Sequence, residues 1–169
     1  MLSEKLLDAL NEQLNKEYYS SYLYLAMAAY FDDKNLQGMA NWMKLQSDEE
    51  HLHAMKFFDF IIRVGGRVKL KAIGEPSSEW DSPQSAFEAA FKHEQFISKS
   101  IYELVSKAID EKEYATQTFL NWFVDEQVEE EETVKAIVEK FIMIGDSASG
   151  MYMLDTELGS RAASAAPAE

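Results

Sequence analysis

Most of the chain repeats apolar side chains at alternating steps of three and four residues, the inward stripe of a bundle helix. Residues 4–32 carry this stripe without an interrupting glycine or proline, and Ser3 is placed to cap them. A second stretch from about 36 to about 64 repeats the pattern and stops at Gly65. Because only the short polar turn of residues 32–35 separates the two stretches, they are predicted to form an antiparallel helical pair.

The second half of the chain repeats this arrangement. A helix is predicted over 83–110, with Ser82 as its cap, and another over about 114–144 after a short polar turn. A short fifth helix is predicted over about 147–159. After Arg161 the chain becomes small and featureless over residues 162–169, and a frayed tail is expected over 160–169.

The connection between the halves, residues 65–82, contains glycine and proline and has no helical period. About 18 residues can extend to about 60 Å, which exceeds the roughly 42 Å of a helix of about 28 residues. The connection can therefore cross the whole bundle and set the third helix parallel to the second. The prediction is an all-α fold: one domain over 1–169, a four-helix bundle with one long crossover between helices 2 and 3 and a short fifth helix.

Composition narrows the function. The 169 residues are 47% hydrophobic, with no cysteine and a formal net charge of −14. The lack of cysteine excludes disulfides, thiolate metal sites and iron–sulfur clusters. The charge makes nucleic acid and anionic membrane surfaces unlikely partners and favours cations. No apolar run is long enough to span a bilayer and the first residues lack signal-peptide features, so a cytoplasmic location is expected.

A few polar side chains interrupt the apolar stripes, and none of them is lysine or arginine. The ones that can carry chemistry are Glu17, Glu50, His53, Glu94, Gln127 and Glu130. In each half they lie about 16 to 19 residues from the connecting turn, or about 25 Å along the axis. The four helices are therefore predicted to bring them to one level near the middle of the bundle.

Glu50 and His53 lie one helical turn apart on the same face and can hold one cation together. Alone, such a pair is usually an ordinary surface pair. Four carboxylates inside a bundle without lysine or arginine, however, must gain a counter-charge or take up protons. A pair of bound metal ions supplies that charge, and carboxylates with one imidazole suit iron, manganese or zinc.

Several longer stretches carry a family resemblance. They are residues 17–24, 49–57 and 65–68, Glu75-Pro76 with Trp80, and Trp122 with residues 126–131. Through them the chain resembles the non-haem ferritins of bacteria and archaea over essentially its whole length. The resemblance implies an iron-storage subunit that oxidises Fe(II) with O₂ or peroxide. It also implies a hollow homo-oligomeric cage of about 24 subunits around a ferric mineral.

The resemblance also assigns roles. Glu17, Glu50 and His53 would hold the first iron of a ferroxidase centre. Glu50 would bridge to a second iron held by Glu94 and Glu130, with Gln127 beside it.

A third iron site is implied nearby, with Glu130 shared. Its pattern is matched by three glutamates beside the stripes: Glu49, Glu126 and Glu129. A run of glutamates is also typical of a solvated helix face. Tyr24 and Trp122 match aromatic residues implicated in electron transfer during oxidation, although both can simply pack.

Two relatives with further cofactors fit less well. Bacterioferritins carry a second Glu-x-x-His where this chain ends in Glu130, and a haem-ligating methionine where it has Leu52, so no haem is expected. Rubrerythrins carry a cysteine-ligated iron domain, and this chain has no cysteine.

Three alternatives remain: a di-metal oxidoreductase or peroxidase that stores nothing, a purely structural bundle, and a smaller Dps-type cage. The last is disfavoured because its ligands lie between subunits.

Overall fold

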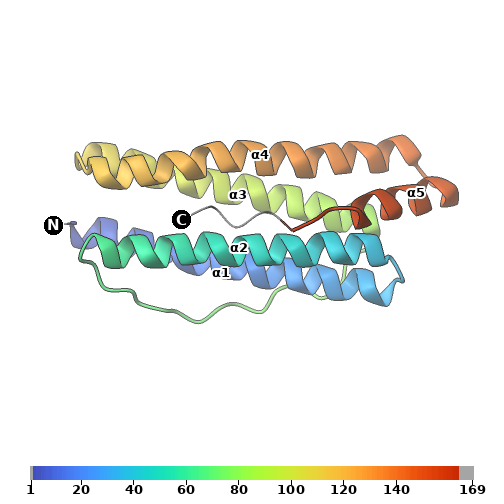
Figure 1. Ribbon diagram of the computed structural model, residues 1–169, viewed down its shortest axis with the longest axis horizontal. Helices are drawn as coiled ribbons and strands as arrows, with labels where there is room; N and C mark the ends of the chain where they lie inside the picture. The colour runs from blue at the N-terminus through green and yellow to red at the C-terminus, as the bar shows by residue number, and fades with distance from the viewer. Residues whose placement is uncertain (1, 164–169) are drawn as a thin grey trace.

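Four long helices lie side by side, and a shorter fifth helix extends from one end of the bundle (Figure 1). This computed structural model describes residues 2–163. The elements are α1 (Glu4–Asp33), α2 (Gln37–Arg63), α3 (Pro83–Asp110), α4 (Tyr114–Ile144) and α5 (Ala148–Gly159). They confirm the predicted all-α bundle with its long crossover between α2 and α3. Within residues 2–163 no helix is both long and apolar enough to cross a membrane.

Three helices begin at capping serines, two of which, Ser3 and Ser82, the sequence indicates. The Ser3 hydroxyl accepts from the Leu6 amide at 3.1 Å, and Ser147 caps α5 in the same way. Ser82 and Ser85 form a reciprocal capping box at the start of α3. These contacts satisfy amide groups that the first helical turn leaves without partners.

The crossover of residues 64–82 runs along the α1–α2 pair (Figure 1). A buried side chain of α1, Asn11, fixes its first part. Asn11 donates to the Arg67 carbonyl oxygen at 3.2 Å and accepts from the Lys69 amide at 2.7 Å. An extended segment makes no backbone hydrogen bonds within itself. The Asn11 side-chain amide supplies bonds of the kind that a neighbouring strand would give.

Two apolar clusters fill the bundle, one toward each end. The first is built around Phe31, Met43, Phe87 and Phe141, and the second around Leu10, Phe57, Ile101 and Phe123. On each helix the buried side chains that can bind or orient a cation lie between the stretches that form the two clusters: Glu17, Gln46, Glu50, His53, Glu94, Gln127 and Glu130. The apolar ends therefore hold the helices together on both sides of a polar middle.

Helix α5 is docked closely on the start of α2. A Cβ atom on Gly38 would lie 1.7 Å from the Asp155 carbonyl oxygen, so only glycine allows this approach. The Asp155 carboxylate accepts from the Met39 amide at 2.8 Å and so caps α2 from outside. Leu154 and Leu158 join the first apolar cluster.

The tail differs from its prediction at the first residues after α5. Arg161 reaches back to α2 and contacts Gln46 and Glu49 instead of fraying, because polar partners are available to it there. Residues 164–169 lie outside the described residues.

Gly38→Ala should displace α5 and lower the free energy of unfolding by about 1–3 kcal/mol, the usual cost of an overpacked contact. Urea unfolding measures the loss. Gly74→Ala is the matched control, because its added carbon would meet Tyr19 at an ordinary 3.8 Å. Equal stability of the two variants would contradict the close approach.

Candidate metal centre

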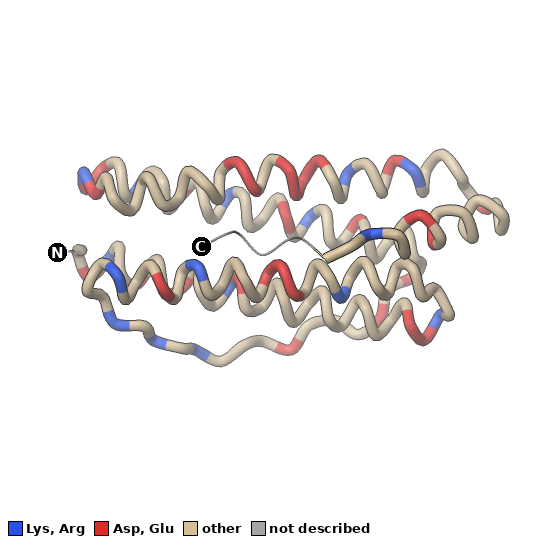
Figure 2. The backbone as a smooth tube through the Cα atoms, in the orientation of Figure 1, with Lys and Arg blue, Asp and Glu red and all other residues tan. Residues whose placement is uncertain are grey.

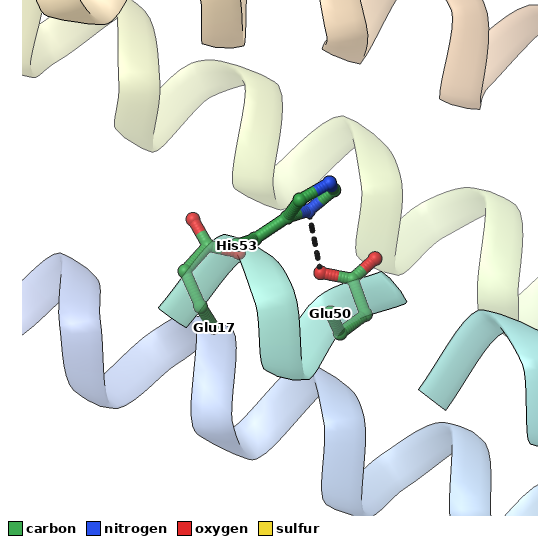
Figure 3. A group of neighbouring side chains, drawn as sticks. All are labelled: Glu17, Glu50 and His53. Atoms are coloured by element: carbon green, nitrogen blue, oxygen red, sulfur yellow. Dashed lines mark hydrogen bonds and ion pairs between the residues drawn. The ribbon is translucent and has the colours of Figure 1, made fainter. Parts of the chain in front are cut away.

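Glu17, Glu50 and His53 meet in the middle of the bundle (Figure 3). Glu17 comes from α1, and the other two from successive turns of α2. His53 Nδ1 lies 3.2 Å from Glu50 Oε2. One possible ligand atom from each residue lies within 4.8 Å of the others, and all three residues are buried. The antiparallel α1–α2 hairpin produces this meeting, because the residues lie at similar distances from its turn.

The α3–α4 pair supplies Glu94, Gln127 and Glu130, which are also buried. Gln127 Nε2 donates to Glu94 Oε2 at 3.1 Å. The Tyr24 hydroxyl of α1 donates to the other Glu94 oxygen. Glu94 is therefore held from both sides by neutral hydrogen-bond donors.

Gln46 joins the two halves of the centre. Its Nε2 donates to Glu130 Oε2 at 2.7 Å and to Glu50 Oε1 at 3.3 Å. The carboxylates from the two hairpins thus share one amide.

Sequence reasoning missed Gln13, a buried side chain one helical turn before Glu17. Gln13 Nε2 donates to Glu17 Oε1 at 2.8 Å. The Gln13 oxygen accepts from the Ser100 hydroxyl, which accepts in turn from Lys16 Nζ at 2.5 Å. The only signal in the sequence was the spacing of four residues, which puts Gln13 and Glu17 on one face. Together with Gln46 and Gln127, it makes buried glutamine amides the usual partners of these carboxylates.

Burial shifts the acidity of most of the centre. Desolvation, followed by the charge of Glu50, raises the pKa of Glu17 and of Glu94 to about 8. Desolvation and then the charge of Glu94 raise the pKa of Glu130 well above its usual range. These carboxyls therefore tend to hold protons at neutral pH until a cation replaces them.

Glu50 and His53 instead form an ion pair. Burial acts to raise the pKa of Glu50, but the charge and hydrogen bond of His53 outweigh it and lower that pKa. Burial likewise acts to lower the pKa of His53, while Glu50 and Glu126 raise it well above its ordinary value. A proton on His53 thus neutralises Glu50, and a metal ion would have to displace that proton.

The residues fit cations well. Among residues 2–163, no lysine or arginine is buried, and Glu17 Oε2 is buried without a hydrogen-bond partner. A second group close enough to share one ion consists of His53, Glu126 and Glu130. Glu94 belongs to neither group, since its oxygens face Tyr24 and Gln127. Carboxylate oxygens with imidazole nitrogen suit iron, manganese or zinc.

The expected third-site residues lie differently from one another. Glu126 is half-buried, and its Oε1 is 3.6 Å from His53 Nε2. Glu49 lies at the edge of the centre, 2.5 Å from Arg161. Glu129 is exposed on α4 and belongs to neither group. The Trp122 ring meets His53 edge-on, with centroids 5.4 Å apart.

Comparison with known proteins decides the family. The profile of the ferritin-like domain matches residues 7–144. A bacterial non-haem ferritin of Bacteroides fragilis is 46% identical over 161 residues, which are 95% of this chain and 100% of the relative. The chain belongs to the ferritin family.

Solved ferritin structures agree closely with this fold. An open-pore ferritin of the hyperthermophilic archaeon Archaeoglobus fulgidus is 53% identical, with a TM-score of 0.95 over 95% of this chain and 98% of that one. A closed form of the same ferritin, engineered by mutagenesis, has the same identity and TM-score over 97% and 100%. The predicted resemblance is therefore confirmed, and the chain is an iron-storage ferritin of the non-haem class. Its buried glutamates and histidine are consistent with a ferroxidase centre.

In metal-free protein, Glu17 and Glu94 should make the free energy of unfolding depend on pH. The unfolded chain releases these protons near pH 4.5, whereas the folded protein keeps them to about pH 8. The folded state binds more protons between these values, so the contribution of the two carboxyls to stability falls as pH rises through 8.

We expect the urea midpoint of chelator-treated protein to fall more steeply between about pH 5.5 and about pH 8.5 in the wild type than in a Glu17→Gln, Glu94→Gln variant. The glutamines keep the shape of the carboxyls without a proton to lose. Parallel curves for the two proteins would show that the carboxyls ionise normally.

Proposed function

We propose that the chain oxidises Fe(II) at a two-iron centre in its middle and delivers Fe(III) to a mineral stored in a cage of about 24 subunits. One observation carries this proposal. Glutamates from all four helices of a ferritin bundle are buried at one level, with no buried lysine or arginine among residues 2–163 to balance them. Divalent cations are the partners that satisfy such a set.

The first Fe(II) is assigned to Glu17, Glu50 and His53. Their ligand atoms already lie close together, and the unpartnered Glu17 oxygen is available to a cation. Glu50 would bridge to a second Fe(II) held by Glu94 and Glu130. For this, Glu94 has to exchange a hydrogen bond for the metal, and Gln127 keeps the carboxylate in place meanwhile.

The protein contributes position and proton release. Each Fe(II) gives one electron, so a pair reduces O₂ to peroxide, or peroxide to water, without a further reductant. Ions held close together with open positions favour this two-electron step. Protons displaced from Glu17, Glu94 and His53 leave as iron enters. The Tyr24 hydroxyl on Glu94 supports an electron-transfer role for that side chain.

We assign a third iron position to Glu49, Glu126 and Glu129, with Glu130 shared. The closeness of Glu126 to His53 and the place of Glu49 at the edge of the centre support it. Figure 2 shows acidic residues in the middle of α2 and α4. Their field would draw Fe(II) toward the centre.

Family membership and exposed apolar side chains support assembly. Met143, Tyr152 and Met153 at the α4–α5 end are 83%, 74% and 70% exposed. Large apolar side chains gathered on one surface mark protein interfaces. We propose that this surface is covered by neighbouring subunits of the cage.

Glu50→Ala combined with His53→Ala should slow Fe(II) oxidation at least about 100-fold, because even partners of metal ligands are worth 10–100-fold. Stopped-flow absorbance of the ferric product measures the rate. His51→Ala is the matched control, since His51 is an exposed histidine of the same helix.

Sedimentation belongs in the same experiment. A fast-sedimenting particle in both variants shows that assembly survived the substitutions. Unchanged oxidation in the double variant would sink the ferroxidase assignment. Rapid oxidation by particles the size of a few chains would favour an oxidoreductase that stores nothing.

A further inference from the structure

Arg161 lies just beyond α5 and outside residues 7–144 that the family profile matches. Its guanidinium packs over the Trp42 ring, 4.6 Å from the centroid. Nη1 donates to Gln46 Oε1 at 2.9 Å and to the Trp42 carbonyl oxygen at 3.5 Å. Nη2 donates to Glu49 Oε2 at 2.5 Å. One side chain thus contacts Gln46, which joins the two halves of the metal centre, and Glu49 at its edge.

The docking of α5 brings Arg161 there. The contact between Gly38 and Asp155, and the hydrogen bond from Met39 to Asp155, fix α5 against α2. Beyond α5 the chain continues in the same direction, beside α2 and toward the middle of the bundle (Figure 1). Because the helix is anchored, Arg161 is delivered to a defined place.

The contact with Gln46 sets the direction of its amide. Arginine only donates hydrogen bonds, so the Gln46 oxygen must face Arg161. The Gln46 nitrogen is then turned to Glu130 and Glu50, to which it donates. If the amide were reversed, its NH₂ group would face the Arg161 donors, and its oxygen would face the Glu130 and Glu50 carboxylates.

The contact with Glu49 balances a carboxylate that borders the centre. Both side chains are largely withdrawn from water, with 22% of Arg161 and 16% of Glu49 exposed. A charge-assisted hydrogen bond is stronger there than on an open surface. A cation that binds Glu49 must compete with the guanidinium for it.

We propose that Arg161 is a positioning residue of the metal centre and the displaceable counter-ion of Glu49. It turns Gln46 toward Glu50 and Glu130, and it leaves Glu49 when a third cation binds there. The exchange rests on the third position proposed above. Lysine would not replace Arg161 fully, because two separate donors must reach Gln46 and Glu49 together.

Anaerobic titration of the assembled protein with Co(II) tests the exchange, with calorimetry for affinity and visible absorption for the ligand environment. In Arg161→Ala, the third Co(II) should bind about tenfold tighter, as expected when a hydrogen bond between charged groups no longer competes. Arg161→Lys should fall between the variant and the wild type. Arg63→Ala is the matched control, since Arg63 also lies over an aromatic ring of α2, that of Phe60.

A Glu49→Gln background distinguishes this exchange from a general change of local structure. If Arg161 weakens third-ion binding through Glu49, then Arg161→Ala should leave the third-step affinity unchanged in a Glu49→Gln background. The same effect in both backgrounds, equal third-step affinity in wild type and Arg161→Ala, or no third Co(II) in either would overturn the proposal. Failure of the two-metal assignment looks different: the first two Co(II) ions would then not bind the wild type.

Discussion

The structure depends on one constraint, the burial of four carboxyl groups in a bundle whose described interior holds no lysine or arginine. An unpaired buried charge costs several kcal/mol, so the groups must be protonated, hydrogen-bonded or bound to cations. Glutamine amides and the Tyr24 hydroxyl donate hydrogen bonds to these carboxyl groups. His53 pairs with Glu50. The apolar clusters on both sides provide the stability that this polar middle does not.

The same constraint explains how iron and protons are linked. Carboxyls whose pKa is raised to about 8 hold protons where iron is proposed to bind, so iron uptake there would release protons. Arg161 would extend this exchange to the edge of the centre, where a guanidinium takes the place of a proton. The fifth helix is then more than a feature of the bundle end, because its docking determines where Arg161 lies.

Sequence periodicity was sufficient to predict the helices and the inward-facing polar side chains. These are Glu17, Glu50, His53, Glu94, Gln127 and Glu130, all of which are buried. A helix fixes which side chains face inward, and counting from each turn fixes their level. Gln13 and Arg161 were not predictable in this way. Gln13 lies beside the stripe, and Arg161 depends on the glycine-mediated contact of α5 with α2. The difference between half-buried Glu126 and exposed Glu129 depends on the rotation of α4, which the pattern does not fix so finely.

Anomalous scattering at the iron edge, from crystals soaked anaerobically with Fe(II), tests the central claim most directly. The account predicts two strong peaks in the buried layer, one among Glu17, Glu50 and His53 and the other beside Glu94 and Glu130. A weaker third peak is expected at Glu126 and Glu129. Peaks confined to exposed glutamates such as Glu132, with none in the buried layer, would contradict it.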